Sequence, residues 1–319
     1  NNPMITRRDY LKYSVLTAAA AALPPQLTRA ASPEDRIFRA IPKTGEQVPI
    51  VGLGSSATFR KMADSGDVSP LSEVLSAFFE NGGTVFDTAP AYGASEEVSG
   101  RLIQELGATE KVFWATKLNV APRGGGAADP EAARAQIERS FKHSGKDPMD
   151  LVQVHQLRDV PTQLACLTDL KEAGRLRYIG VTYTGDQLYP DLAKVMREEP
   201  IDFIGVDYAV DNRKAADVIL PLAIERGIGV LVYLPFGRTR LWARVAGRDL
   251  PSWAAEIGVE SWAQFFIKFA GAHPAVTSVT PSTSKAKHVL DNLGAGVGEL
   301  PDEALQKRMA DFVDTLPSA

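Results

Sequence analysis

The sequence is poor in several features, and each shortage excludes a class of protein. Cys166 is the one cysteine among 319 residues, so the chain can form neither an internal disulfide nor a cysteine-rich zinc cluster. The apolar run between Tyr13 and Leu23 is shorter than the ~20 residues of a permanent transmembrane helix, and no other stretch is long enough. With 45% apolar residues, the composition is that of a globular protein and excludes collagen and a disordered chain.

Positive charge is concentrated in the first 31 residues. These carry Arg7, Arg8, Lys12 and Arg29 against Asp9, which leaves 31 basic and 38 acidic side chains in the remaining 288 residues. The resulting net charge of −7 argues against a nucleic-acid partner and favours a solvated enzyme or binding protein.

The first 31 residues have the pattern of an export signal. Arg7 and Arg8 precede the apolar run, and small residues follow at 30–32. This order resembles the bacterial twin-arginine export signal, which implies export of the folded protein to the periplasm by the twin-arginine export machinery. We therefore predict a cleaved signal at 1–31, one domain at 32–319, and no stable membrane association. The alternative is a weakly amphipathic N-terminal helix.

Short runs rich in β-branched and aromatic residues alternate with segments of helical period along the rest of the chain. Strands are expected at 50–53, 84–88, 112–118, 151–156, 178–181, 203–208, 230–234 and 276–280. Helices are expected at 69–81, 95–106, 129–143, 161–173, 188–198, 214–226, 259–270 and 285–293. A hairpin at 37–51 precedes this series, and a last helix at 302–316 follows it.

Strict alternation of strand and helix requires a parallel sheet with right-handed crossovers. Eight units predict the α/β class and a closed (β/α)8 TIM barrel with an N-terminal β-hairpin and a C-terminal extra helix. The competing open, doubly wound sheet needs a glycine-rich turn after its first strand. Gly52 and Gly54 are followed by Ser55, Ser56 and Ala57, so the third glycine of that turn is missing.

Polar side chains stand at the carboxyl ends of three consecutive strands, where a barrel places its reactive groups. Asp87 lies near the end of the second strand, Lys117 of the third and His155 of the fourth. Tyr92 follows five residues after Asp87. Taken singly, each has a simpler explanation. Asp87 could be a turn residue and Tyr92 an aromatic at the rim. Lys117 could extend to solvent, and His155 could be a core histidine. Because neighbouring strands lie about 5 Å apart, the group is expected to converge on one pocket.

This combination suits proton transfer coupled to hydride transfer. A tyrosine hydroxyl has a pKa of about 10, and a lysine ammonium beside it favours the phenolate and lowers that pKa. An aspartate keeps a buried ammonium charged, and a histidine can donate a hydrogen bond to a carbonyl oxygen. The other histidines, His143, His273 and His288, lack partners at ligand spacing, so no metal site is predicted.

Several segments resemble, in order and spacing, the motifs of the aldo-keto reductase family. They are 41–46, 52–54, 86–96, Lys117, His155, 174–182, 233–238 and 280–284 through Asn292. The resemblance implies a (β/α)8 barrel that binds NADPH and reduces small aldehydes or ketones. It makes Asp87, Tyr92, Lys117 and His155 the catalytic tetrad, with Tyr92 as general acid.

The resemblance also implies where the cofactor binds. Tyr233 would stack on the nicotinamide. The adenosine end, near a helix start that can hold a phosphate, would be faced by Ser282, Thr283, His288 and Asn292. The implied cofactor positions are Gly54, Thr182, Tyr233, Leu234, Gly237, Arg238, Ser282, Thr283, Ser284, His288 and Asn292.

Four positions depart from the family pattern. Tyr183 and Gly205 stand where the family usually has asparagine and glutamine to hold the nicotinamide carboxamide. Ser282 replaces a frequent lysine and His288 a frequent arginine, so NAD stays open beside NADP. We predict an NAD(P)H-dependent carbonyl reductase. The alternative is a nucleotide-binding barrel with little or no turnover, in a cofactor-binding or scaffold role.

Overall fold

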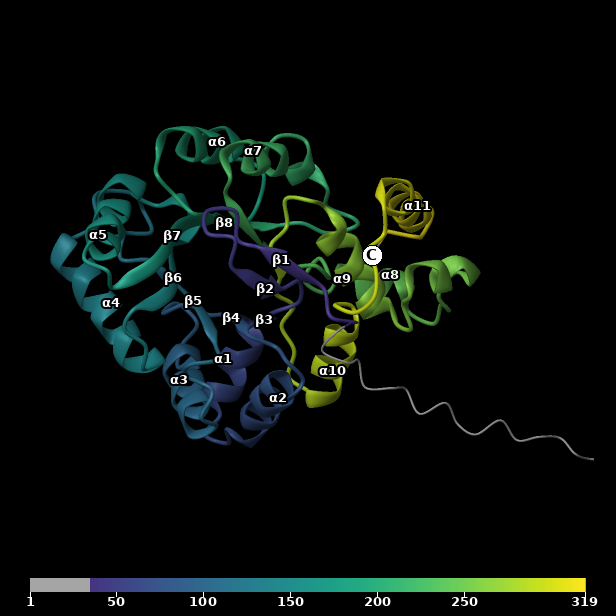
Figure 1. Cartoon of the computed structure of the whole chain (residues 1–319), viewed down its shortest axis with the longest axis horizontal. Coiled ribbons are helices and arrows are strands. Elements are labelled where there is room, and N and C mark those ends of the chain that lie inside the picture. Colours follow the sequence, from purple (N-terminus) through teal and green to yellow (C-terminus); the bar gives the residue numbers. More distant parts are fainter. Residues whose placement is uncertain (1–34, 319) are drawn as a thin grey trace, which may run out of the picture.

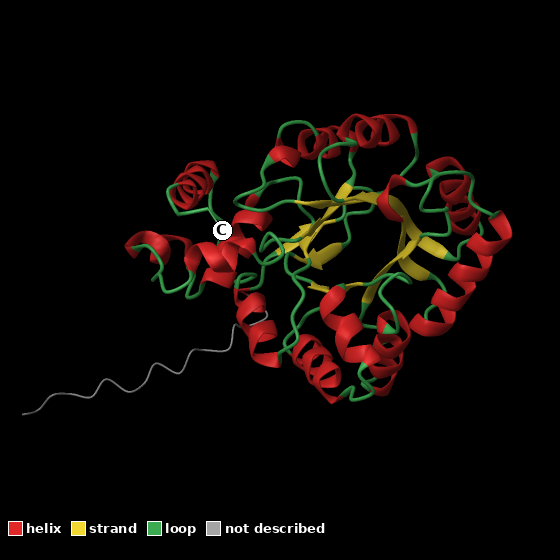
Figure 2. Cartoon of the chain, turned by 180° about the vertical axis from the view of Figure 1, so that it is seen from behind, coloured by secondary structure: helices red, strands yellow, loops and turns green. Residues whose placement is uncertain are grey.

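The computed structural model describes residues 35–318, which form a ring of parallel strands enclosed by helices (Figures 1 and 2). The barrel strands are β3 (Leu53–Gly54), β4 (Val85–Asp87), β5 (Phe113–Leu118), β6 (Met149–Val154), β7 (Leu176–Tyr183), β8 (Phe203–Asp207), β9 (Gly229–Tyr233) and β10 (Ser278–Val279). Each pairs in parallel with the next along the chain. The ring closes through a bridge between Val51 and Val279, where Gly52 N donates to the Val279 carbonyl at 2.8 Å. The predicted (β/α)8 barrel is confirmed.

Helices surround this ring, and the C-terminal helix lies further out at one side of the molecule (Figures 1 and 2). They are α1 (Ala57–Asp64), α2 (Ser69–Glu80), α3 (Ser95–Glu105), α4 (Pro130–Ser144), α5 (Val160–Glu172), α6 (Tyr189–Glu198), α7 (Ile219–Arg226), α8 (Arg240–Val245), α9 (Trp262–Ala272), α10 (Ala286–Gly294) and α11 (Glu303–Asp314). The predicted hairpin is present as β1 (Phe38–Ala40) and β2 (Gln47–Pro49), and the predicted C-terminal helix as α11.

Helix α4 illustrates how local sequence sets the ends of a helix. Asp129 accepts a hydrogen bond from Glu131 N at 3.0 Å, and Pro130 occupies the first helical position. Gly145 ends the helix with a φ of 67°, a conformation that glycine adopts without steric strain. These are the sequence signals that mark the start and end of a helix, and the predicted start agrees with the observed one to within a residue.

The interior of the barrel is filled by side chains. The buried cluster inside it consists of Ile41, Val48, Val85, Phe113, Ala115, Leu151, Tyr178, Phe203 and Leu231. Ile41 and Val48 come from the hairpin, which lies across the amino-terminal end of the strands (Figure 1). Tyr233, at the end of β9, packs against the same cluster. The polar side chains at the carboxyl ends of the strands therefore stand on a packed floor.

The structure corrects the expected elements in three places. Helices α1 and α8 were not expected, because each is a short segment in a stretch that reads as a loop. The expected helix 214–226 is divided into a 3-10 turn at Lys214–Ala216 and α7. His155, expected to end a strand, follows it instead: β6 ends at Val154, and Gln156 has a φ of 64°, which a strand cannot contain.

The predicted export signal, residues 1–31, lies outside the described residues. Among the helices of the described part of the chain, none combines the length and the apolar character needed to cross a membrane.

Truncating Ile41 tests whether the hairpin completes the barrel core. The Ile41 side chain is fully buried, so Ile41→Ala leaves a cavity in the lumen. We expect the free energy of unfolding, measured by urea denaturation, to fall by about 2–5 kcal/mol. Ile224→Ala, on the exposed side of α7, is the control and should change it by about 0.5 kcal/mol at most. Equal effects of the two substitutions would contradict the packed lumen.

Candidate active site

The four predicted catalytic residues lie together at the carboxyl ends of the strands. Asp87 is the last residue of β4, Lys117 lies in β5, and His155 follows β6 directly. The parallel register places Asp87 opposite Ala115 and Lys117 opposite Gln153. All four predicted residues line one cavity of about 400 Å³.

Asp87 and Lys117 form a buried ion pair at the base of this cavity. Lys117 Nζ lies 2.7 Å from Asp87 Oδ1 and also donates to the Thr88 carbonyl at 2.8 Å. Burial raises the pKa of Asp87, against the opposing effects of Lys117 and of the Tyr233 hydroxyl. Burial disfavours the ammonium, but Asp87 and Tyr92 raise the pKa of Lys117 above its usual value. The Asp87 carboxylate thus keeps the Lys117 ammonium charged although its side chain is shielded from water.

Tyr92 lies in the loop between β4 and α3, beside this ammonium. The loop turns through a hydrogen bond from Tyr92 N to the Ala89 carbonyl at 3.1 Å, and Lys117 Nζ lies 5.3 Å from the centre of the Tyr92 ring. Burial raises the pKa of Tyr92, while the charge of Lys117 lowers it and the charge of Asp87 raises it. The predicted lowering is wrong, because burial outweighs the effect of Lys117. Tyr92 is therefore a neutral phenol at neutral pH, the form that can donate a proton.

His155 lies beside Tyr92. The two rings meet edge to face, with centres 6.1 Å apart. Burial, with Lys117 and Arg158 nearby, lowers the pKa of His155 to about 3. The imidazole is neutral at physiological pH, so it carries one N–H donor and one acceptor.

Six of the predicted cofactor residues line the same cavity. They are Gly54, Thr182, Tyr233, Leu234, Arg238 and Ser282. The hydroxyl of Ser282 is buried and has no hydrogen-bond partner among the described residues. An unsatisfied polar atom at the wall of a cavity is a position where a ligand oxygen fits.

The other predicted cofactor residues do not line this cavity. Gly237 lines a smaller cavity of about 190 Å³ next to it, together with Arg238 and Arg240. The remaining four, Thr283, Ser284, His288 and Asn292, lie around the start of α10 or within it. Thr283 Oγ1 lies 3.4 Å from His288 Nδ1, so these two side chains contact one another.

Gln156 is a cavity residue that sequence reasoning missed. Its amide lies against Thr184, donating to Thr184 Oγ1 at 2.8 Å and accepting from Thr184 N at 3.2 Å. Other unpredicted residues of the cavity wall are Ser55, Ser56, Ala57, Thr58, Pro235, Phe236, Thr239 and Thr280. Most of them lie within four residues after the end of a strand, and that position was the one available signal.

The structure also shows the surroundings of two departures from the family pattern, Tyr183 and Gly205, and of the loop residue Arg240. The Tyr183 hydroxyl donates to Gln187 at 3.1 Å, away from the tetrad. Arg240, a loop cation after β9, is paired with Asp211 at 3.1 Å. Gly205 lies directly under the ring of Tyr233, where a Cβ atom would come within 2.5 Å of it.

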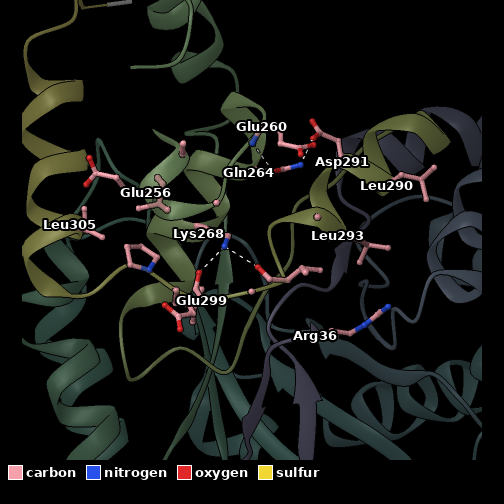
Figure 3. Close-up of a pocket in the computed structure, with 18 of the residues that line it drawn as sticks. Arg36, Glu256, Glu260, Gln264, Lys268, Leu290, Asp291, Leu293, Glu299 and Leu305 are labelled. Carbon is pink, nitrogen blue, oxygen red and sulfur yellow. Dashed lines mark hydrogen bonds between the residues drawn. The ribbon is translucent and has the colours of Figure 1, made fainter. Parts of the chain in front are cut away.

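A larger cavity of about 950 Å³ lies outside the barrel, between α9, α10 and the start of α11 (Figure 3). Lys268 is buried in its wall and donates to the carbonyls of Val297 at 2.9 Å and Glu299 at 2.7 Å. This lysine holds the segment after α10 against α9. None of the four predicted catalytic residues lines this cavity; all four line the smaller one.

Within residues 35–318, no group of three or more histidine, cysteine, aspartate or glutamate side chains is arranged to hold a metal ion.

The comparison with protein families agrees with this geometry. Residues 51–309 match the model of the aldo/keto reductase family. The match spans well over half of the chain, and the protein belongs to this family.

Individual relatives are distant. The aldo-keto reductase str7 of Strobilurus tenacellus is 25% identical over 264 residues, which cover 72% of this chain and 77% of that protein. The aldo-keto reductase YhdN of Bacillus subtilis (strain 168) is 29% identical over 204 residues, which span 61% of each chain.

Solved structures share the fold. The holo form of aldo-keto reductase AKR11C1 from Bacillus halodurans has a TM-score of 0.69 at 21% identity, over 89% of this chain and 97% of that chain. An aldo-keto reductase from Klebsiella pneumoniae in complex with NADPH has a TM-score of 0.67 at 21% identity, over 84% of this chain and 92% of that chain.

Removing one member of the ion pair should destabilise the protein more than removing both. Lys117→Met leaves the Asp87 carboxylate buried without its cation, so we expect the free energy of unfolding to fall by about 3–5 kcal/mol. Adding Asp87→Asn should recover most of that loss, because no unpaired charge remains. Urea denaturation of both variants measures the difference, and equal losses would show that the pair is not ionic.

Proposed function

We propose that the protein reduces a small aldehyde or ketone to an alcohol, using NADPH as the hydride donor. The observation that carries this proposal is the neutral Tyr92 phenol beside the buried Asp87–Lys117 pair, with His155 facing the same cavity. Membership of the aldo/keto reductase family supports the reaction type. The Klebsiella relative, described in complex with NADPH, supports the cofactor.

The tetrad residues divide the proton chemistry between them. His155 donates a hydrogen bond to the carbonyl oxygen of the substrate, and Tyr92 donates its proton to that oxygen as negative charge develops there. Lys117 then stabilises the Tyr92 phenolate, and Asp87 keeps Lys117 charged. Bound NADPH would supply the hydride to the carbonyl carbon, so the alcohol gains one hydride and one proton.

The residues of the cavity wall fit a nicotinamide nucleotide. Tyr233 offers its ring as a stacking surface, and Gly54, Thr182 and Leu234 stand beside it. Arg238 has no charged partner among the described residues and would contact the pyrophosphate. The unsatisfied Ser282 hydroxyl would take up a phosphate oxygen near the start of α10. Thr283, Ser284, His288 and Asn292 would extend this surface along the adenosine, and Gly237 would border it. NAD is the alternative cofactor.

Tyr92→Phe is the direct test of the proposed role of Tyr92. It removes the proton donor and keeps the ring, so we expect the rate of NADPH oxidation with aldehydes to fall by about 10²- to 10⁴-fold. Cofactor affinity, measured by fluorescence titration with NADPH, should stay within about threefold, because the ring still fills its place. Equal rates for Tyr92→Phe and wild type would contradict the general-acid role.

The same two measurements distinguish the alternative function. A nucleotide-binding barrel without turnover would bind NADPH and oxidise it with no member of an aldehyde and ketone panel. Absence of binding would exclude both functions.

We propose further that residues 1–31 direct the folded protein to the periplasm through the twin-arginine export machinery. The paired arginines, the short apolar run and the small residues at 30–32 support this proposal. Changing Arg7 and Arg8 together to lysine should move the protein from the periplasmic to the cytoplasmic fraction of a bacterial host. Changing Lys12 and Arg29 to the other basic residue is the matched control, and equal export of the two variants would contradict the proposal.

A further inference from the structure

The hydroxyl of Tyr233 reaches the catalytic ion pair from the far side of the barrel. Tyr233 Oη donates to Asp87 Oδ2 at 3.0 Å and lies 3.2 Å from Gln153 Nε2, which donates to it. Lys117 Nζ is 5.2 Å from the centre of the Tyr233 ring. The two oxygens of the Asp87 carboxylate therefore have different donors, Lys117 on Oδ1 and Tyr233 on Oδ2.

This arrangement depends on a missing side chain in the neighbouring strand. Gly205 of β8 lies under the tip of the Tyr233 ring, and a Cβ atom there would be 2.5 Å from both Cε2 and Oη. The ring cannot easily move aside, because its hydroxyl is held by two partners and its body packs against the lumen cluster. Any residue larger than glycine at position 205 would displace the hydroxyl from Asp87.

We infer that Tyr233 is a positioning residue of the tetrad, whose hydroxyl fixes the Asp87 carboxylate on Lys117 through the space that Gly205 leaves free. This inference rests on the proposed function, since it concerns the same four catalytic groups. It adds a role for the hydroxyl of Tyr233 that the stacking of its ring on a nicotinamide does not require.

The physical reason lies in the burial of Asp87. Its side chain is almost inaccessible to water, so each oxygen needs a donor to keep the carboxylate ionised. The titratable groups that face it are Lys117 from β5, Tyr233 from β9 and Tyr92 from the loop after β4. Gln153 of β6 is uncharged and acts on Asp87 through Tyr233. Loss of the Tyr233 donor leaves Lys117 as the one side-chain donor to the carboxylate among the described residues.

Removing that donor should shift the pH dependence of the reaction in a defined direction. A hydrogen bond to the charged form lowers the pKa of a carboxyl group, so its loss raises the pKa of Asp87. The reaction needs ionised Asp87, and activity is lost as the pH falls through that pKa. In Tyr233→Phe we therefore expect the acid limb of the profile of kcat against pH to move upward by about one pH unit. The Kd for NADPH should change by about threefold at most, because the ring remains.

Tyr178→Phe is the matched control. Tyr178 lies in the same lumen, and its hydroxyl donates to the carboxylate of Glu46 at 2.6 Å, at the hairpin end of the barrel. Its loss removes the same kind of hydrogen bond without touching Asp87. We expect the acid limb of Tyr178→Phe to coincide with that of wild type. If the acid limb of the pH profile moved equally in both variants, the effect of Tyr233→Phe would reflect a general loss of stability, and the inference would be overturned.

A second measurement is independent of turnover. The ¹³C resonance of the Asp87 carboxyl group, assigned by its absence in Asp87→Asn, reports its titration directly. We expect it to titrate about one unit higher in Tyr233→Phe than in wild type, and higher also in Gly205→Ala, in which the ring is displaced. Unchanged titration in both variants would overturn the inference. If wild type shows no turnover but the Asp87 titration moves as expected, the inference stands and the proposed function fails.

Discussion

The candidate active site depends on one interaction, the buried ion pair between Asp87 and Lys117. The two side chains meet at 2.7 Å where almost no water reaches them, so each charge is held mainly by the other. The pair sets a fixed positive charge beside Tyr92, whose pKa is raised by burial. In the proposed reaction, the phenolate left after proton donation would face this ammonium. The neutral His155 adds a donor without adding a competing charge.

The barrel explains why such a pair can exist in this place. The lumen is packed from the hairpin upward, and Tyr233 lies over the last apolar layer as the floor of the cavity. The polar groups at the strand ends therefore have packed apolar side chains on one side and the cavity on the other. In the parallel register Asp87 lies opposite Ala115, two residues before Lys117 on the adjacent strand. Residues two apart in a strand point to the same face, so the long lysine side chain can reach the carboxylate without a special loop. The loop residue Tyr92 is the one tetrad member whose position depends on a turn.

Much of this arrangement could be predicted from the sequence, because it follows from periodicity. Alternation of strands and helices predicted the barrel, and polar residues ending apolar runs predicted Asp87, Lys117 and His155. The contribution of Gln156 could not be predicted, since its position depends on a backbone turn with positive φ after β6. The contact of Tyr233 with Gly205 could not be predicted either, because it depends on how the Tyr233 ring packs against a residue of the neighbouring strand. The direction of the Tyr92 pKa was predicted wrongly because sequence shows the neighbouring charge but not the depth of burial.

The most direct test of the account follows the hydride itself. The protein would be incubated with an aldehyde panel and NADPH deuterated at the transferring position of the nicotinamide, and each alcohol analysed by mass spectrometry and NMR. The account predicts one deuterium on the carbon that bears the new hydroxyl group, and about 100-fold less labelled alcohol, or less still, in a parallel reaction of Tyr92→Phe over the same time. Alcohol formed without deuterium at that carbon, or bound cofactor that never transfers its label, would contradict it.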